Sequence, residues 1–145
     1  MDRTDFAHVT PVTVAWGDMD AMGHVNNTTF FRYVESGRIS YFNTLAGDGP
    51  PVWGRGGSPI LADIQCSFIE QLQYPAEIEV YTRIARLGGK SMTLEAAIFE
   101  QSSGTAAATS KATIVWFDYE EQATVRIPEE MRERIRSFEA VAPAE

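Results

Sequence analysis

The spacing of hydrophobic and polar positions changes about 60 residues into the chain. Between residues 28 and 45, apolar side chains recur every three or four positions, and further apolar residues widen the stripe. This spacing predicts a long helix that is buried on most sides. Gly37 lies inside it and costs roughly 1 kcal/mol of helix stability relative to alanine. We expect that cost where the helix backbone must approach a sheet closely.

Beyond residue 60, apolar residues alternate with polar ones, which is the period of a half-buried strand. The alternation and the glycine-containing turns predict four strands, over residues 60–69, 77–87, 91–101 and 105–117. On the first of them, Ile60, Ala62, Ile64, Cys66 and Phe68 share one face. Successive strands joined by short turns indicate an antiparallel sheet with one buried face.

The flanking segments complete this order. The apolar run at residues 12–16 predicts a first strand, with His8 in a tail before it and a loop over residues 17–27 after it. Residues 47–58 predict a second loop, and residues 128–139 predict a terminal helix with a proline in its first position. One strand, one buried helix and several long strands indicate a single α+β domain over residues 1–145, with the sheet wrapped around the helix.

Composition narrows the possible functions. A formal net charge of −8 argues against nucleic acid and against anionic membrane surfaces, although a local group of cations can still bind an anion. Cys66 is the one cysteine, so it forms no internal disulfide, and it has no neighbouring metal ligand. The chain has neither a signal-like segment at its start nor an apolar run of about 18 residues. We therefore expect a cytoplasmic protein without a metal site.

The densest group of polar residues lies between the first predicted strand and the long helix. It contains Asp18, Asp20, Gly23, His24, Asn26 and Asn27. Either asparagine can cap the helix, and the remaining N–H groups of the first turn suit a developing negative charge, such as the oxyanion of a thioester or ester. An ordinary turn with a cap has the same composition, and Asp18 and His24 can each be structural hydrogen-bonding residues of the loop.

Residues 16–38 resemble the signature of the 4-hydroxybenzoyl-CoA thioesterase-like branch of the hotdog superfamily. The Asp-x-Asp-x-x-Gly-His-Val-Asn-Asn core stands at residues 18–27, and a helix with aromatic residues and Glu-x-x-Arg follows. The resemblance extends over nearly the whole chain, through Pro-Ile at 59–60, Lys-Ser at 90–91 and Ile-Pro-Glu-Glu at 127–130. It departs from the family pattern at Phe30, where many relatives carry tyrosine, and at Gly37, where alanine is usual.

This resemblance implies a hotdog fold and hydrolysis of an acyl-CoA thioester without a cofactor. It also implies homodimers, or dimers of dimers, with sites at the subunit interface. Asp20 matches the catalytic carboxylate, acting as nucleophile or general base, and the backbone N–H of Asn27 matches the oxyanion donor; His24 is a further catalytic candidate. Lys90 matches a position that contacts the CoA phosphates in relatives. The substrate-binding positions implied in all are Gly23, Val25, Asn26, Arg86, Lys90 and Ser91.

Two other functions fit the same fold, namely a hydratase or dehydratase of enoyl thioesters and a non-catalytic module that binds acyl-CoA. Another carboxylate, Glu35, lies eight residues beyond Asn27, or roughly 12 Å along a helix. Because that is too far for a carbonyl held at the helix start, we expect Glu35 to form a structural ion pair with Arg38, three residues later.

Overall fold

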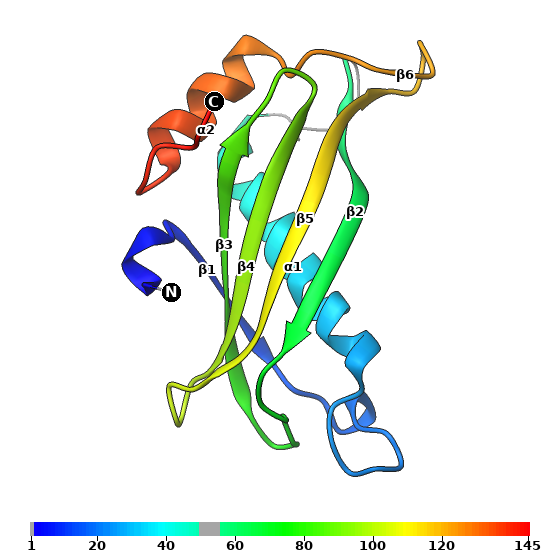
Figure 1. Ribbon diagram of the computed structural model, residues 1–145, viewed down its shortest axis with the longest axis vertical. Helices are drawn as coiled ribbons and strands as arrows, with labels where there is room; N and C mark the ends of the chain where they lie inside the picture. Colours follow the sequence, from blue (N-terminus) through cyan, green and yellow to red (C-terminus); the bar gives the residue numbers. More distant parts are fainter. Residues whose placement is uncertain (1, 50–55) are drawn as a thin grey trace.

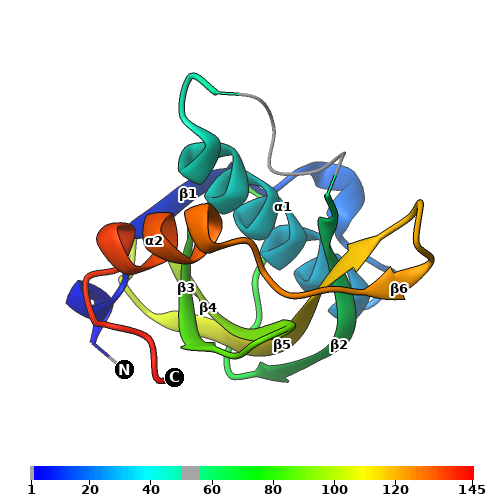
Figure 2. The same ribbon diagram turned by 90° about the horizontal axis from the view of Figure 1, so that it is seen from above.

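The structure, a computed structural model, describes residues 2–49 and 56–145. A long helix, α1 (Asn27–Ala46), lies within the curve of one antiparallel sheet (Figures 1 and 2). The sheet has the order β1-β3-β4-β5-β2, and a short strand, β6, pairs with β5. Its strands are β1 (His8–Thr13), β2 (Ser58–Phe68), β3 (Glu77–Leu87), β4 (Ser91–Glu100), β5 (Ala106–Asp118) and β6 (Ala123–Thr124). This arrangement confirms the predicted α+β hotdog fold.

Helix α1 is buried because it packs on the inner face of the sheet. Tyr41 and Phe42 are almost fully buried. A Cβ atom at Gly37 would lie 2.6 Å from Cγ1 of Val80 and 2.8 Å from Oγ1 of Thr82, both on β3. Such distances leave no room for a methyl group, so the close approach predicted for Gly37 is confirmed.

The first strand differs from the prediction over residues 12–16. β1 begins at His8, and Trp16 instead opens a short 3-10 turn, η2 (Trp16–Asp18), where its side chain is 72% exposed. His8 is buried rather than in a tail, with Nε2 3.0 Å from Oγ of Ser40 and 3.1 Å from Oγ1 of Thr10, and burial lowers its pKa. The inward positions of β1 are thus partly polar, which conceals the strand from a search for hydrophobic alternation.

One edge strand of the sheet contains a proline, and the other contains a bulge. β1 is one edge and contains Pro11, a residue that sheets accept at their edges. β2 is the other edge, and its register against β5 shifts between Leu61 and Asp63. This bulge places Leu61, rather than Ile60, on the face shared with the later apolar residues of the strand, because directly paired residues share a face. The predicted one-sided alternation of β2 is therefore wrong in its first half.

Two elements remain beside the sheet and α1. Helix α2 (Glu129–Phe138) follows Pro128, which is its capping residue and not its first helical residue. A short 3-10 turn, η1 (Arg3–Asp5), precedes β1. Of the loop predicted at residues 47–58, positions 50–55 lie outside the described residues, and β2 already begins at position 58. No helix in the described ranges has the length and apolar character needed to cross a membrane.

Candidate active site

The loop before α1 is a compact turn with its own backbone hydrogen bonds. The N–H of Asp20 donates to the carbonyl of His24, the N–H of Gly23 donates to the carbonyl of Asp20, and both distances are 3.0 Å. Gly23 has a φ of 83°, a conformation that glycine adopts without strain. The N–H of Asn26 donates to the carbonyl of Asp18 at 3.0 Å. The loop therefore holds its side chains in fixed positions against the start of the helix.

Asp18 is a structural residue of this loop. Its Oδ2 accepts a hydrogen bond from the Tyr33 hydroxyl at 2.7 Å and another from the N–H of Ala15 at 2.9 Å. Burial, together with the Asp18 carboxylate, raises the pKa of the Tyr33 phenol. These contacts tie the loop to α1, so the structural interpretation of Asp18 is the one that the geometry favours.

Asp20 is held differently, at the edge of a cleft. Its Oδ1 accepts a hydrogen bond from the N–H of Met22 at 2.8 Å, and its Oδ2 accepts one from Nδ2 of Asn26 at 3.0 Å. Within residues 2–49 and 56–145, no cation forms an ion pair with it. The carboxylate is therefore oriented by neutral donors and remains exposed to a ligand in the cleft.

The start of α1 supplies a backbone donor beside this carboxylate. Asn26 is the cap, since its Oδ1 accepts the N–H of Thr28 at 2.8 Å and its carbonyl accepts the N–H of Thr29 at 2.9 Å. The N–H of Asn27 has no acceptor in the described part of the chain. A free N–H at the positive end of a helix dipole is a favourable site for a negative oxygen.

The cleft lies between the start of α1 and the end of β2 and has a volume of about 460 Å³. Its walls are partly apolar: the ring of Phe30 is buried and meets the ring of Phe68 edge-on, with 5.3 Å between centroids. The lining residues are Asp20, Met22, His24, Val25, Asn26, Asn27, Phe30, Phe68, Ile69, Glu70 and Gln71. The segment 68–71 was not predicted as part of the site, because it reaches the cleft only through the tertiary fold.

The predicted CoA-binding residues Arg86, Lys90 and Ser91 lie elsewhere. Ser91 pairs with Val115, which pairs in turn with Ile60 at the start of β2, whereas the cleft lies at the other end of that strand. Eight residues of extended strand separate the two ends, or roughly 26 Å. Figure 1 shows the β3–β4 turn and the start of α1 at opposite ends of the molecule. Within one chain, the fold therefore brings together Asp20, His24, Asn26 and Asn27. The predicted CoA-binding residues of the β3–β4 region lie far from them.

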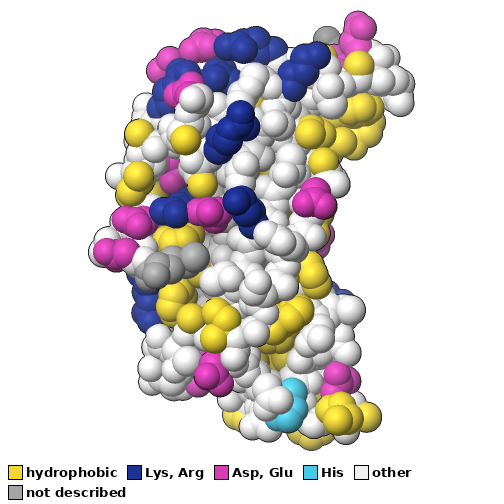
Figure 3. Space-filling view, in the orientation of Figure 1, with side chains coloured by type: hydrophobic (Ala, Val, Ile, Leu, Met, Phe, Trp, Pro, Cys, Tyr) yellow, Lys and Arg dark blue, Asp and Glu magenta, His cyan; other side chains and the backbone are white. Residues whose placement is uncertain are grey.

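The β3–β4 turn, residues 88–90, is surrounded by exposed cations. A Cβ atom at Gly88 would lie 3.1 Å from Nη1 of Arg86, and one at Gly89 would lie 3.7 Å from Nη1 of Arg126. Together with Lys90, these arginines form what we call the turn cations: Arg86, Lys90 and Arg126. No ion pair is found for any of them among the described residues. Figure 3 shows Lys and Arg side chains gathered at this end. Arg126 was not predicted, since nothing local in its sequence connects it with Lys90.

Two other expectations concern residues outside the cleft. Glu35 lies 3.8 Å from the guanidinium of Arg38, so the structural ion pair is confirmed. In the described ranges, no group of three or more His, Cys, Asp or Glu side chains could hold a metal ion. Burial raises the pKa of the Cys66 thiol.

Two relatives were found by sequence. YsmA of Bacillus subtilis, an uncharacterized protein, is 32% identical over 92 residues, which are 63% of this chain and 60% of its own. The chloroplastic acyl-acyl carrier protein thioesterase ATL2 of Arabidopsis thaliana is 25% identical over 122 residues, which are 84% of this chain and 64% of its own. This chain thus spans about three fifths of the length of these relatives.

Solved structures match over more of the chain. A thioesterase from Thermus thermophilus, complexed with coenzyme A and zinc, is 30% identical with a TM-score of 0.82, and the match covers 94% of this chain and 97% of that one. The PA5185 protein of Pseudomonas aeruginosa is 26% identical with a TM-score of 0.83, covering 99% and 97%. The family model of the thioesterase-like superfamily matches residues 14–135, from before the Asp20 loop into α2. By its sequence and its fold, the chain belongs to the thioesterase-like superfamily.

Proposed function

We propose that the protein hydrolyses an acyl-CoA thioester in the cleft at the start of α1, with Asp20 as the catalytic carboxylate. The observation that carries this proposal is that a carboxylate and a free backbone donor lie in one cleft. Asp20, whose carboxylate has no ion pair in the described structure, and Asn27, whose N–H has no acceptor there, line the same cleft of about 460 Å³. An acyl carbonyl between them would have a carboxylate near its carbon and a donor near its oxygen.

The chemistry needs little more than these two groups. In one route a carboxylate oxygen of Asp20 bonds to the carbonyl carbon, the CoA thiolate leaves, and water hydrolyses the resulting mixed anhydride. In the other, Asp20 takes a proton from water as that water attacks. Both routes pass through an oxyanion that the N–H of Asn27 would stabilise, and a single well-placed donor contributes about 3–4 kcal/mol. His24 lines the same cleft and is our candidate for orienting the attacking water.

Two further observations support CoA as the carrier of the acyl group. The Thermus thermophilus relative was solved with coenzyme A. In this chain the turn cations are grouped on a molecule of net charge −8, and they have no anionic partner in the described residues. The diphosphate and 3′-phosphate of CoA are suitable anions for such a group, whereas a carrier-protein thioester lacks them.

We also propose that the protein is a homodimer that joins these two regions. β2 is an edge strand, and its apolar residues Leu61 and Phe68 are 41% and 44% exposed. A two-fold axis through an antiparallel β2–β2 pair would place the Phe68 end of one subunit beside the Ile60 end of the other. Each cleft would then approach Lys90 of the partner subunit. We expect a mass of about twice 16.1 kDa in solution, and larger even assemblies if such dimers pair again.

The decisive experiment compares wild type and Asp20→Asn in a thiol-release assay over aromatic, short-chain and long-chain acyl-CoAs. We expect kcat to fall by at least about a hundredfold, the scale of a lost general base or nucleophile. Folding should persist, because the Asn side-chain oxygen can still accept the N–H of Met22. Glu35→Gln is the matched control: it should lower the melting temperature slightly through Arg38 and leave kcat near the wild-type value.

The same assay separates the alternative functions. Near-native turnover in Asp20→Asn would refute the assignment of Asp20, and a collapse of kcat in a well-folded Glu35→Gln would transfer the role to that carboxylate. Consumption of an enoyl thioester without release of thiol would identify a hydratase. Binding of acyl-CoA esters without any turnover would identify a binding module.

A further inference from the structure

The backbone of the β3–β4 turn is fixed by its carbonyl groups. The carbonyls of all three residues 88–90 accept hydrogen bonds from outside the turn. The donors, in order, are Nη1 of Arg132 at 2.6 Å, the N–H of Ile127 at 2.9 Å and the N–H of Trp116 at 2.9 Å. The N–H groups of Gly89 and Lys90 have no acceptor in the described residues. The N–H of Gly88 closes the turn from within by donating to the carbonyl of Ser91 at 2.8 Å, and the three donors hold it from outside.

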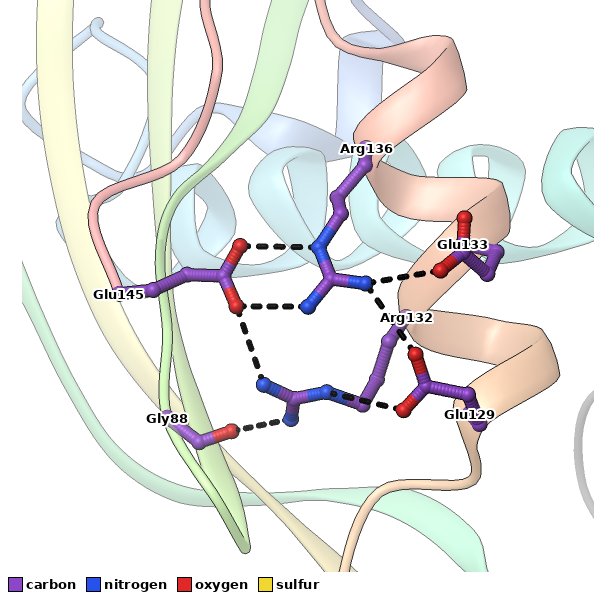
Figure 4. Close-up of polar contacts among 6 residues, drawn as sticks. All are labelled: Gly88, Glu129, Arg132, Glu133, Arg136 and Glu145. Carbon is purple, nitrogen blue, oxygen red and sulfur yellow. Dashed lines mark hydrogen bonds and ion pairs between the residues drawn. The ribbon is translucent and has the colours of Figure 1, made fainter.

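Arg132 is the unusual donor of the three, because it is a buried cation. Its guanidinium lies between α2 and the turn (Figure 4), and the residue is only 5% exposed. Nη2 donates to Glu145 at 3.2 Å, and Nε lies 3.8 Å from Glu129. Glu145 also accepts hydrogen bonds from Arg136, at 2.7 and 2.9 Å. Burying a charged group costs free energy that its partners must offset, and the charges of these two glutamates oppose that cost, although Nε is buried without a hydrogen-bond partner in the described residues. Glu145 also holds the guanidinium in place against the Gly88 carbonyl.

We propose that Arg132 is a positioning residue for the nucleotide end of the CoA site, and this inference rests on the proposed function. Arg132 does not touch the substrate in this scheme. It acts through the carbonyl of Gly88, which keeps the turn in the conformation that presents the turn cations together to the phosphates. Of the turn cations only Lys90 belongs to the turn itself, so a turn that relaxes by an ångström or two would move its ammonium relative to Arg86 and Arg126. Because Coulomb energies vary with distance, that movement would weaken the contact of Lys90 with the phosphates.

Arg132→Lys tests the proposal, because lysine keeps the charge but cannot bridge Gly88 and Glu145 with a rigid fork. We expect KM for a full acyl-CoA to rise about fivefold, the effect of roughly 1 kcal/mol of binding free energy. The value of kcat should stay within about twofold, and KM for the matching pantetheine thioester, which lacks the phosphates, should not change.

Arg134→Lys is the matched control on the same helix. Its guanidinium also donates to backbone carbonyls, those of Leu45 and Ala46 at 2.8 and 3.2 Å, but these belong to the end of α1. We expect it to lower the melting temperature without changing either KM. If Arg132 only fixed α2 to the sheet, Arg132→Lys would behave in the same way, and that result would overturn the proposal.

A double-mutant cycle with Lys90→Ala tests the route of the effect. Because Arg132 acts through the turn that carries Lys90, the combined variant should raise KM for the acyl-CoA less than the product of the two single effects. Independent, multiplicative effects would contradict the proposal. So would equal rises in KM for the acyl-CoA and the pantetheine thioester.

A milder variant and a binding measurement keep the test independent of folding and of turnover. Glu145→Gln removes the charge of a 40% exposed side chain that holds the same guanidinium, and we expect a smaller rise in KM in the same direction. The Kd of CoA itself is measured by calorimetry on every variant. If the wild type binds CoA but hydrolyses no thioester, the proposed function fails while the Kd values still test Arg132. Normal hydrolysis with an unchanged Kd in Arg132→Lys overturns the positioning role alone, and absence of CoA binding overturns both.

Discussion

The side chain of Asn26 connects the fold to the proposed chemistry, because its two polar atoms have different partners. Its oxygen accepts the N–H of Thr28 and caps α1, while its NH2 group donates to Asp20. The cap thus fixes the carboxylate relative to the helix start. Sequence alone could bring Asp20, Asn26 and Asn27 together because they are neighbours in one loop. It could not add Phe68 or Arg126, which reach their sites only through the tertiary fold.

Gly37 allows a direct test of packing at this scale. Gly37→Ala adds a methyl group 2.6 Å from Cγ1 of Val80, so α1 or β3 must move. We expect a net loss of about 1–3 kcal/mol in the free energy of unfolding, despite the better helix propensity of alanine. Urea unfolding measures it, with the exposed Ser36→Ala on the same helix as control. A Gly37→Ala variant as stable as Ser36→Ala would contradict the close contact.

Among the elements, the ones with regular hydrophobic periods were predicted well and the irregular ones were not. α1 and β3 lie within one residue of their predicted bounds, because apolar residues recur along each at the spacing of a helix or of a strand. β1 was misplaced because His8 and Thr10 point inward and bond to each other. The prediction of which β2 side chains share a face was wrong, because the bulge shifts their alternation by one residue. Nothing local in the sequence marks this bulge.

The junction of α1, β3 and α2 is closed by a buried carboxyl group. Glu139 follows α2, and its Oε1 accepts hydrogen bonds from the Tyr41 hydroxyl and from the N–H of Ile84. Its Oε2 has no hydrogen-bond partner in the described structure. Burial raises the pKa of this carboxyl above its usual value of 4.5, although the two hydrogen bonds and the nearby Arg83 oppose the shift.

The raised pKa of Glu139 makes the free energy of unfolding depend on pH in a definite direction. The folded state binds the Glu139 proton more tightly than the unfolded state, so the stabilisation is fully present below about pH 4.5 and is lost as the pH rises through the folded pKa. Glu139→Gln keeps the accepting oxygen without the charge. Urea unfolding between pH 4 and 8 should show the wild type losing stability relative to this variant, by at most about 1.4 kcal/mol per pH unit. The exposed Glu133→Gln is the control, and a pH-independent difference for Glu139→Gln would contradict the prediction.

For the whole molecule, the main question is how the cleft and the turn cations come to serve one substrate. They lie at opposite ends of one chain, yet the proposed dimer joins each cleft to the cations of the other subunit. The family resemblance implied such sites at a subunit interface. The spacing of hydrophobic residues could not indicate them, because pairing between two chains produces no periodic pattern within one chain. The edge position of β2 is the structural reason for expecting it.

Mixing two chains with different defects tests this arrangement. Lys90→Ala should weaken acyl-CoA binding, and Asp20→Asn should abolish turnover. When the two chains are refolded together at equal amounts, half of the dimers are mixed and each contains one intact shared site, so about a quarter of wild-type activity should return at low substrate concentration. Each variant refolded alone is the control. No recovery in demonstrably mixed dimers would mean that each site belongs to one subunit.

The proline in β1 also limits how far such an assembly can extend. A proline offers no amide hydrogen to an incoming strand, so the Pro11 edge is a poor template for further pairing. Only the β2 side could accept another chain, and a two-fold contact would occupy that side in both copies. Growth by strand addition would stop at two, and the protein would be protected from polymerising into fibres.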